Sequence, residues 1–552
     1  TKQLLEDAKK FIQGLKNKGE DIPDRIGWFL TASENKKNKP WLFFVFFLVL
    51  LPLMFIAYQQ NSNQKLQQAK KKEYEDKIAI SEAKARLSSG EKQFIDTNSF
   101  KRRGISFFER DKQKAIVHFK VAKDLVKNDP ETLIYLNNAI ALQGVQEKHL
   151  TIAVSVPIAI NRQVAQEILR GVAQAQDDWN KKWKECANNG NEKYKDCKIQ
   201  KPLQVIIASD DNDNEIAKNI ARYLVDEDRK ENVLAVIGHN ASNVSNAVLD
   251  IYQSKKLVMI SPTSFAMNHH RISNSLIDNK NYIYTMSPPI KSLIRRIKDE
   301  IIKDSGKGGV RVLFCYDSRA DDQKLIKKHF YEGNDEIKLK IFPEAHAVGN
   351  DKDVYKENID ECNYNNPINH QNLIEYAKEK EIKYIFVAPH VNTISDSIFL
   401  IKDFSDLKLK LYSSPTLYTG DTLFSGKPDI EGLKLAVFWH PKADQKSMDF
   451  HKKAEKLWGK DDNTIITWRT AFAYDATQKI LHGVEAIFAE RIELNRANLQ
   501  VKIAAEIPFQ GITGSIEFDP KNGERKGEPN TYITKVCKNK KTKDYEFASN
   551  CN

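Results

Sequence analysis

The feature that most constrains this chain is an uncharged, mainly aliphatic and aromatic stretch, WLFFVFFLVLLPLMFIAY, from Trp41 to Tyr58. A helix rises about 1.5 Å per residue, so about 18 to 20 residues cross the ~30 Å hydrocarbon core of a bilayer. Pro52 lies inside the stretch, and membrane helices tolerate proline. A buried core helix is the alternative, but such helices rarely run this long without a polar side chain. We therefore expect a transmembrane helix at residues 41–58.

The charges on either side of this stretch predict its orientation. Lys36, Lys37 and Lys39 precede it, whereas the neutral run QQNSNQ follows it and lysines return only at Lys65. Basic residues favour the cytoplasmic side of a membrane. The long leading region and the lack of a small-x-small cleavage site favour a retained signal-anchor over a cleaved signal peptide. Residues 1–40 are then a cytoplasmic arm, and the rest of a single-pass protein is periplasmic or otherwise extracytoplasmic.

The net charge of +12 could suggest a nucleic-acid partner. However, the basic residues are mixed with acidic ones, and the clearest cluster, Lys70 to Lys72, lies shortly after the expected membrane span. This position favours a solvated surface near anionic lipid, with no nucleic-acid partner.

All six cysteines follow the expected span, which agrees with export to an oxidising compartment. Cys186 and Cys197 flank a polar loop, and Cys537 and Cys551 bracket a polar C-terminal stretch, so each pair could form a disulfide. Cys315 and Cys362 remain. Cys315 lies in the apolar run VLFCY and is expected to be a buried free thiol. No cysteine or histidine spacing indicates a metal site.

Two helical segments follow the membrane span. Residues 59–89 are rich in Gln, Lys, Glu and Ala, which is typical of a solvated helical stalk. Within residues 90–149, apolar residues recur at helical spacing and Asp129-Pro130 separates two helices, a pattern that resembles one tetratricopeptide-like helical pair. A single repeat cannot bury its own face, so we expect it to pack against its neighbours rather than form a peptide-binding array.

From Leu150 onward, short β-branched strands alternate with amphipathic helices, as in HLTIAVSVPIA followed by QVAQEILRGVAQAQDDWN. Such alternation predicts parallel sheets with helices on both faces. The rhythm restarts near residue 290. We therefore expect an α/β protein with two doubly wound parallel-sheet lobes.

Residues 150 to 535 resemble the type I periplasmic binding proteins, in the branch that binds leucine, isoleucine and valine. The resemblance is carried by several segments in order: EILRGVAQAQDDWN, VLAVIGHNASNVSNAVLDIYQSKKLVMISPTS, WRTAFAYDATQKIL and GITGSIEFDPKNGER. The helical segment ahead of the binding module resembles a bacterial, cyanobacterial-type subgroup. The family implies a three-crossing hinge near 286–289, 439–441 and 511–514. It divides residues 150–552 into lobe 1, about 150–287 and 440–510, and lobe 2, about 288–439 and 511–552.

The family also implies where a ligand binds, because ligands of open α/β sheets lie at the carboxyl ends of the strands, beside helix N-termini. The strand ends of lobe 1 offer hydroxyl donors for a carboxylate. The strand ends of lobe 2 offer groups for an amine. The candidate ligand-binding residues are Ser242, Thr263 and Ser264 of lobe 1 and Tyr316, Asp317, His390, Thr416 and Tyr418 of lobe 2.

Two features of this candidate site depart from the family pattern or have a structural alternative. The family acid that holds the amine has no clear equivalent near Thr416, so either Asp317 serves instead or the ligand is not an amino acid. Each hydroxyl could instead be a helix N-cap, and Tyr418 could pack beside the hinge.

These features favour a membrane-anchored solute-binding receptor for a small polar, amino-acid-like ligand, acting with an ABC permease or as a sensor. The alternative is an interaction or scaffold protein with a degenerate cleft. An enzyme is not expected, because the chain has no nucleophile elbow, P-loop or Rossmann glycine fingerprint, and no cofactor is implied.

Overall fold

The computed structural model describes residues 51–143, 149–187, 198–226, 232–306, 310–332, 339–342, 362–364, 370–459, 465–505, 508–527 and 529–551. The expected cytoplasmic arm and residues 41–50 of the expected membrane span lie outside these ranges. Helix α4 (Leu51–Ala85) begins within the expected span. No helix among the described residues combines the length and the apolar character needed to cross a bilayer. The chain divides into two compact units, residues 1–78 and 79–552, and both lobes belong to the second unit.

Lobe 1 is built on a six-stranded sheet in the order β1-β3-β2-β4-β5-β6. All neighbouring strands are parallel except β1, which runs antiparallel to β3 at the edge. The strands are β1 (Leu87–Ser88), β2 (Leu150–Val156), β3 (Leu203–Ser209), β4 (Ala235–Ile237), β5 (Val258–Ser261) and β6 (Ile283–Thr285). The helices that accompany them are α8 (Arg162–Ala187), α9 (Asn214–Val225), α10 (Ser242–Ser254), α11 (His269–Asn274), α18 (Gln445–Trp458), α19 (Trp468–Glu490) and α20 (Arg496–Ala504).

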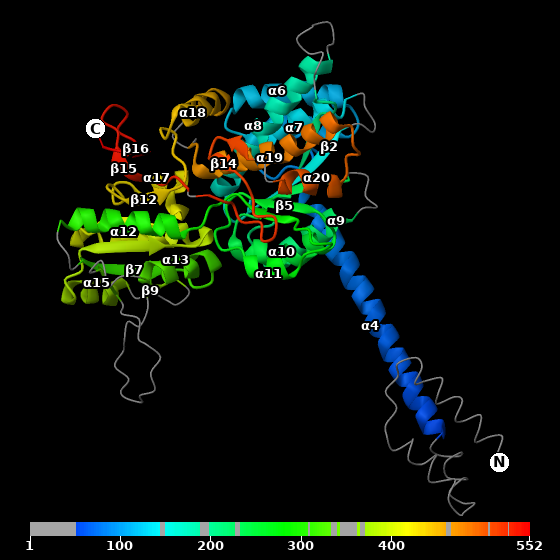
Figure 1. The fold of residues 1–552 in the computed structure, drawn as a ribbon, viewed down its shortest axis with the longest axis horizontal. Coiled ribbons are helices and arrows are strands. Elements are labelled where there is room, and N and C mark those ends of the chain that lie inside the picture. The colour runs from blue at the N-terminus through cyan, green and yellow to red at the C-terminus, as the bar shows by residue number, and fades with distance from the viewer. Residues whose placement is uncertain are drawn as a thin grey trace, which may run out of the picture. The chain divides into compact units, whose positions relative to one another are not determined.

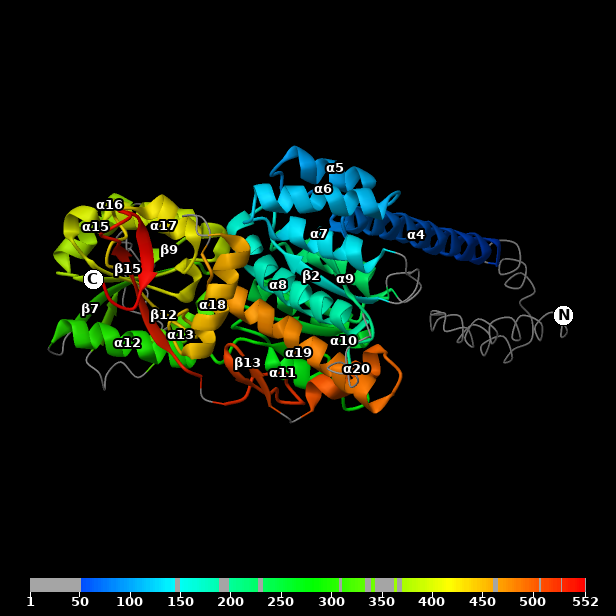
Figure 2. The same cartoon turned by 90° about the horizontal axis from the view of Figure 1, so that it is seen from above.

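Lobe 2 is built on an eight-stranded sheet in the order β16-β15-β12-β11-β10-β7-β8, with β9 also paired to β7. The strands are β7 (Val310–Tyr316), β8 (Leu339–Phe342), β9 (Cys362–Asn363), β10 (Tyr384–Ala388), β11 (Lys410–Ser413), β12 (Lys434–Val437), β15 (Tyr532–Lys538) and β16 (Tyr545–Ala548). The first six are parallel, and β15 and β16 add an antiparallel edge. The helices are α12 (Lys291–Ser305), α13 (Asp321–Tyr331), α15 (His370–Glu379), α16 (Ile394–Asp403) and α17 (Gly420–Gly426). Helices α12 and α13 pack side by side on one face of this sheet, and α15 and α16 lie on the other face (Figures 1 and 2).

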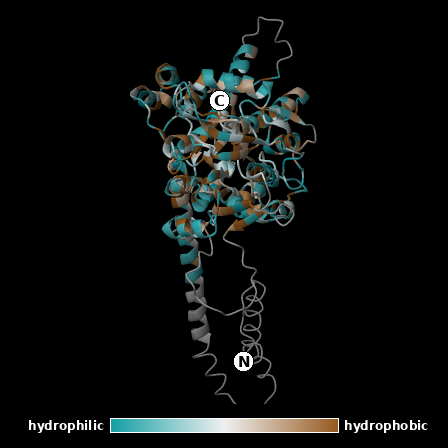
Figure 3. Ribbon diagram, turned by 90° about the vertical axis from the view of Figure 1, so that its left-hand side faces the viewer, coloured by the Kyte–Doolittle hydropathy of each residue, from teal (hydrophilic) through white to brown (hydrophobic). Residues whose placement is uncertain are grey.

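The strands of both sheets form as expected because their side chains are apolar on both faces. Every residue of β2, β3 and β10 is buried, which is typical of parallel strands covered by helices on two sides. In Figure 3 the outer helices carry both brown and teal residues, as amphipathic helices do when one face packs on a sheet.

The chain crosses between the lobes three times: after β6, after β12 and before β15. The first crossing contains residues 286–289 and the second contains residues 439–441. The hairpin β13 (Phe509–Gly511) and β14 (Gly514–Ile516) stays with lobe 1, because Asp475 of α19 accepts the N–H groups of Ile512 at 2.9 Å and Thr513 at 2.7 Å. The third crossing therefore lies after Arg525, which donates to the Met286 carbonyl at 3.2 Å, and not near residues 511–514.

The helical segment comprises α5 (Ser99–Phe108), α6 (Lys112–Leu125) and α7 (Pro130–Ala141), which begin after the N-caps Asn98, Asp111 and Asp129. Helix α7 packs against α8 and β3 (Figure 2). Asn138 of α7 accepts the Val205 N–H at 2.9 Å and donates to the Val205 carbonyl at 2.7 Å. The segment thus buries its apolar face against lobe 1.

The disulfides partly correct the predicted pairing. Cys537 and Cys551 are bonded as predicted. Cys186 is also disulfide-bonded, and its predicted partner, Cys197, lies outside the described residues. The prediction that Cys315 is a free thiol is wrong: it is bonded to Cys362. Parallel pairing of β7 with β9 places these two residues opposite each other, with their Cα atoms 4.6 Å apart. Pairing between strands that are distant in the chain has no signature in the local sequence, so the sequence did not predict this disulfide.

Candidate functional site at the junction of the lobes

The carboxyl ends of the two parallel sheets face each other across the junction between the lobes. Asn161, which follows β2, donates to the Val391 carbonyl at 2.8 Å, and Asn212, which follows β3, donates to Asn392 Oδ1 at 3.2 Å. Val391 and Asn392 follow β10. Open α/β sheets bind ligands at the carboxyl ends of their strands, so this junction is the candidate site.

The junction is also bridged at α13 and at β12. Asn246 of α10 donates to Asp321 Oδ2 at the start of α13, over 3.3 Å. Phe265, which follows β5, packs against Phe438 and Trp468 with ring centroids 6.0 Å and 5.3 Å apart. The protein's own polar and aromatic side chains thus join the lobes directly in this structure.

A buried hydrogen-bond network supports the strand ends of lobe 1. Asp210 Oδ2 lies 2.6 Å from His239 Nδ1 and accepts the Ser155 hydroxyl at 2.8 Å, while its Oδ1 accepts the Asn212 N–H at 3.0 Å. Asp210, His239 and Ser155 are fully buried. The network ties together the segments at the ends of β2, β3 and β4 and so positions Asn212 at the junction.

The three lobe 1 candidates are buried near one another, but their hydroxyls already have partners. Thr263 donates to the Asn240 carbonyl at 2.8 Å, and Ser242 accepts the Ala266 N–H at 3.2 Å. Ser264 is 2.8 Å from the hydroxyls of both Ser245 and Ser261. These bonds lie within lobe 1, so Ser264 in particular stabilises the packing of the β4 and β5 ends.

The two lobe 2 candidates at the end of β7 also have hydrogen-bond partners within the protein. Lys327 donates to the Tyr316 hydroxyl at 3.1 Å. Asp317 is fully buried. Its carboxylate accepts hydrogen bonds from Nε and Nη2 of Arg319, at 2.9 Å and 2.8 Å, and from the Thr393 hydroxyl at 3.1 Å. Burial opposes ionisation, but these hydrogen bonds together hold the pKa of Asp317 below its ordinary value. Its carboxylate is therefore already satisfied.

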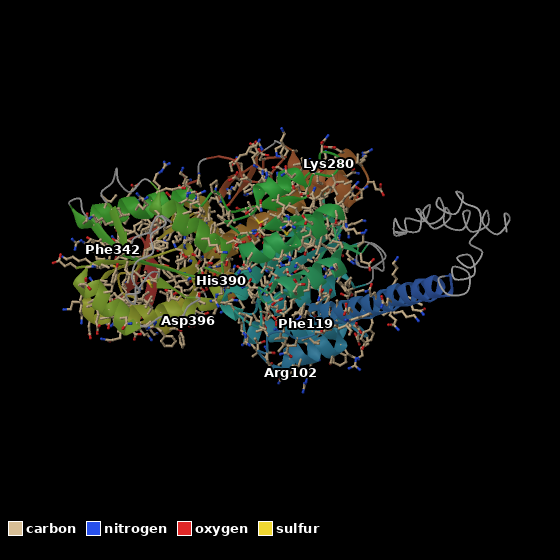
Figure 4. The ribbon with its side chains drawn as sticks, turned by 90° about the horizontal axis from the view of Figure 1, so that it is seen from below. Arg102, Phe119, Lys280, Phe342, His390 and Asp396 are labelled. Carbon is tan, nitrogen blue, oxygen red and sulfur yellow. A yellow bond between two sulfur atoms is a disulfide. The ribbon has the colours of Figure 1, made fainter. Side chains whose placement is uncertain are left out.

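His390, by contrast, presents a buried polar atom with no partner. Figure 4 places it between the two lobes. Burial lowers the pKa of His390 to about 4, so the ring is neutral at physiological pH. Its Nδ1 accepts the Asn392 N–H at 3.3 Å, which puts the proton on Nε2. Nε2 is shielded from solvent and has no hydrogen-bond partner. An unpaired buried donor is costly, and an oxygen of a ligand would satisfy it.

Thr416 and Tyr418 lie on the loop after β11, which a buried ion pair holds against lobe 1. Arg469 of α19 donates to the carbonyls of Thr416 and Tyr418, each at 3.0 Å, and to Glu167 of α8 at 3.1 Å. The Tyr418 ring packs edge-on against Phe547 at 4.4 Å, which favours the hinge-side packing role. The Thr416 hydroxyl accepts from Gln323 at 3.3 Å.

Asp322, which the sequence patterns did not single out, has an unsatisfied carboxylate oxygen at this junction. It lies in the first turn of α13, next to Asp321, which contacts lobe 1. Gln323 donates to its Oδ2 at 3.0 Å, and the backbone N–H groups of Asp322 and Gln323 lie near the carboxylate, but Oδ1 is shielded from solvent and makes no hydrogen bond. Burial raises the pKa of Asp322 to about 6. In the sequence, an acid in the first turn of a helix is commonplace, so only the tertiary structure distinguishes Asp322 from an ordinary surface acid.

The junction therefore combines an unpaired N–H donor, an unpaired carboxylate oxygen and further buried acceptors. Gln323 Oε1 and Ser414 Oγ are also shielded and without partners. Such a set could bind a molecule that carries both an acceptor and a donor. Among the described residues, no group of three His, Cys, Asp or Glu side chains could hold a metal ion.

Comparison with known proteins identifies the fold. No family model matches the chain, and no curated protein matches it. Solved structures do match. A substrate-binding protein of an ABC transporter from Desulfitobacterium hafniense, in complex with leucine, has a TM-score of 0.51 and 19% identity, and covers 73% of this chain and 100% of its own. The leucine-binding protein LivK of Thermotoga maritima has a TM-score of 0.52 and 17% identity, and covers 72% of this chain and 97% of its own.

A third match is LivJ of Streptococcus pneumoniae in complex with isoleucine, with a TM-score of 0.52 and 14% identity over 70% of this chain and 96% of its own. These similarities confirm the predicted mixed α/β fold with parallel sheets, the fold of the type I periplasmic binding proteins.

Proposed function

We propose that this chain is an extracytoplasmic solute-binding receptor that closes its two lobes over a small polar ligand carrying both an ammonium and a carboxylate group. The observation that carries the proposal is the pair of unpaired buried groups at the lobe junction, His390 Nε2–H and Asp322 Oδ1. The donor fits a ligand carboxylate and the acceptor fits a ligand ammonium, and charge-assisted hydrogen bonds are the stronger ones. An amino acid or a related compound has both groups.

We expect the other candidate residues to contribute to ligand binding when the lobes close. Ser242 and Thr263 supply hydroxyls from lobe 1, and Thr416 supplies one from lobe 2. Ser264, Tyr316, Asp317 and Tyr418 are engaged in bonds within the protein and support the site. The proposal requires binding only, with no catalytic step and no cofactor.

The cellular setting extends the same proposal. A signal-anchor at residues 41–58 would hold the receptor outside the membrane as a single-pass protein of cyanobacterial type. The disulfides Cys315–Cys362 and Cys537–Cys551 support an oxidising compartment. The receptor would then serve an ABC permease or a signalling partner.

One observation favours the alternative of an interaction protein with a degenerate site. Phe265, Phe438 and Trp468 pack together where the lobes meet, so part of the junction is filled by the protein's own rings. In that case the helical segment, and not the junction, would contact a partner.

Titration of the purified full chain with amino acids, amides, urea and short peptides, followed by thermal unfolding, distinguishes the two functions. A ligand that binds only the folded state raises the melting temperature in proportion to ln(1 + [L]/Kd). The receptor predicts a saturable shift that Asp322→Asn weakens and that Asp406→Asn, an exposed control outside the junction, leaves intact. No shift with any of these compounds would refute the receptor.

A further inference from the structure

A separate cavity of about 560 Å³ lies between the helical segment and lobe 1. Its walls come from the end of α4, α5 and α6 on one side, and from β1, β3 and α9 of lobe 1 on the other. The volume falls within the range of about 300 to 1,000 Å³ that is typical of small-molecule sites. None of its lining residues belongs to the lobe junction.

One wall of this cavity is apolar. It is formed by five buried side chains: Leu87, Phe108, Ile206, Leu224 and Val233. A wall of this kind favours hydrocarbon, because removing apolar surface from water is favourable.

Two half-buried lysines face the same space. Lys92 donates to the carbonyl of Lys84 near the end of α4, and Lys112 donates to the carbonyl of Phe108, the last residue of α5. The Lys112 ammonium also lies 4.3 Å from the centre of the Phe108 ring. An ammonium has three donors, so each lysine retains donors after these bonds. Among the described residues, neither lies within 4.0 Å of a carboxylate oxygen.

The charged residues that line the cavity balance overall, but the half-buried ones carry a net positive charge, which favours an anion. The half-buried charged groups are Lys92, Lys112 and Glu91, and the Glu91 carboxylate already accepts the Ser89 N–H at 2.7 Å. Lys84, Glu109 and Asp226 also line the cavity but are exposed, so solvent screens them. Burial lowers the pKa of both Lys92 and Lys112, although the Glu91 carboxylate acts in the opposite direction on each.

We infer that this cavity is a second ligand site, which binds a small monocarboxylate with a branched or aromatic hydrocarbon body. The carboxylate accepts from Lys92 and Lys112, and the hydrocarbon body packs on Phe108, Ile206 and Leu224. Because the two lysines belong to the helical segment and part of the apolar wall belongs to lobe 1, the ligand bridges the two and stabilises their docking.

Calorimetric titration of the purified full chain with 4-methylpentanoate tests this site. We expect saturable binding that persists in Asp322→Asn, because the junction is a separate site. The neutral 4-methylpentanamide has the same hydrocarbon body and should bind at least about tenfold more weakly, since hydrogen bonds to charged groups contribute more than neutral ones.

Substitutions of the two lysines, compared with a control substitution outside the cavity, test whether these lysines bind the carboxylate. Lys92→Met and Lys112→Met each keep the apolar stem and should each weaken 4-methylpentanoate binding about tenfold, whereas Lys92→Arg keeps the charge and should retain it. Lys255→Met, at an exposed position outside the cavity, should have no effect. If one methionine variant fails to fold, the other still tests the site. Absence of binding, equal binding of the amide, or unchanged affinity in both methionine variants would overturn the inference.

Discussion

Glu167 and Arg469, 302 residues apart in the chain, form a buried ion pair with Glu167 Oε2 and Arg469 Nη1 3.1 Å apart. The Thr419 hydroxyl, from lobe 2, donates to the other Glu167 oxygen at 2.6 Å, and Thr467 donates to Oε2 at 2.8 Å. Arg469 in turn donates to the carbonyls of Thr416 and Tyr418. One ion pair within lobe 1 thus holds a loop of lobe 2.

Removing one partner of this pair should destabilise the protein strongly. Arg469→Met leaves the Glu167 carboxylate buried without its cation and leaves two carbonyls without donors. The expected loss is about 3–5 kcal/mol in the free energy of unfolding, the range for broken buried pairs. Urea unfolding followed by circular dichroism measures it.

The double variant Arg469→Met with Glu167→Gln is the control, because it removes both charges. Its loss should be smaller than that of Arg469→Met alone. Equal losses would mean that the ion pair does not determine the stability of this region.

Ligand binding at the junction should weaken in acid through Asp322. The pKa of Asp322 without ligand is about 6 because the carboxyl is buried. A ligand ammonium requires the ionised carboxylate, so binding releases a proton at low pH, and affinity falls as the pH drops through this pKa. Between pH 7 and pH 5 the Kd should rise about tenfold. Calorimetry across this range checks the slope.

The variant Asp322→Asn separates this effect from general acid sensitivity of the protein. It should bind the ligand more weakly and lose the pH dependence between pH 5 and pH 7. A variant that keeps the wild-type slope would assign the pH dependence to another group.

Of the two disulfides, the one that closes the longer loop should contribute more to stability. Cys315 and Cys362 are separated by 47 positions, and Cys537 and Cys551 by 14. In the loop-entropy model the first bond contributes about 4 kcal/mol and the second about 3 kcal/mol. Paired serine variants, compared by urea unfolding without reductant, measure both. A larger loss from the C-terminal pair would contradict the model.

Gly171 permits the close approach of α8 and α19. A Cβ atom at this position would lie 2.2 Å from the Thr470 carbonyl oxygen and 2.7 Å from the Tyr474 nitrogen, both of which are backbone atoms. Gly171→Ala should therefore cost at least about 1–3 kcal/mol, because the helices must separate. Thermal unfolding measures the loss.

Gly483 of α19 is the matched control. A Cβ atom there would meet mainly the flexible end of Leu499, at 3.0 Å, and alanine favours a helix over glycine by about 1 kcal/mol. Gly483→Ala should leave the melting temperature nearly unchanged or raise it. Similar losses for both variants would show that helix packing at Gly171 is not the cause.

Local patterns in the sequence predicted much of the architecture. The alternation of β-branched runs and amphipathic helices after Leu150 indicated two parallel sheets, and the ends of those strands indicated the segments that meet at the junction. His390 became a candidate in this way, because it lies just after the apolar run of β10. Pro130 and its N-cap Asp129 likewise marked the start of α7.

Only the tertiary structure decided which polar groups are satisfied and which are not. Asp317 and Asp322 look equivalent in the sequence, yet Arg319 and Thr393 satisfy the first, while the second keeps a buried oxygen without a partner. The Cys315–Cys362 bond and the Glu167–Arg469 pair also depend on register and packing between distant segments. Periodicity is encoded by neighbouring residues and can be read directly, whereas desolvation and pairing are set by residues that folding brings together from far along the chain.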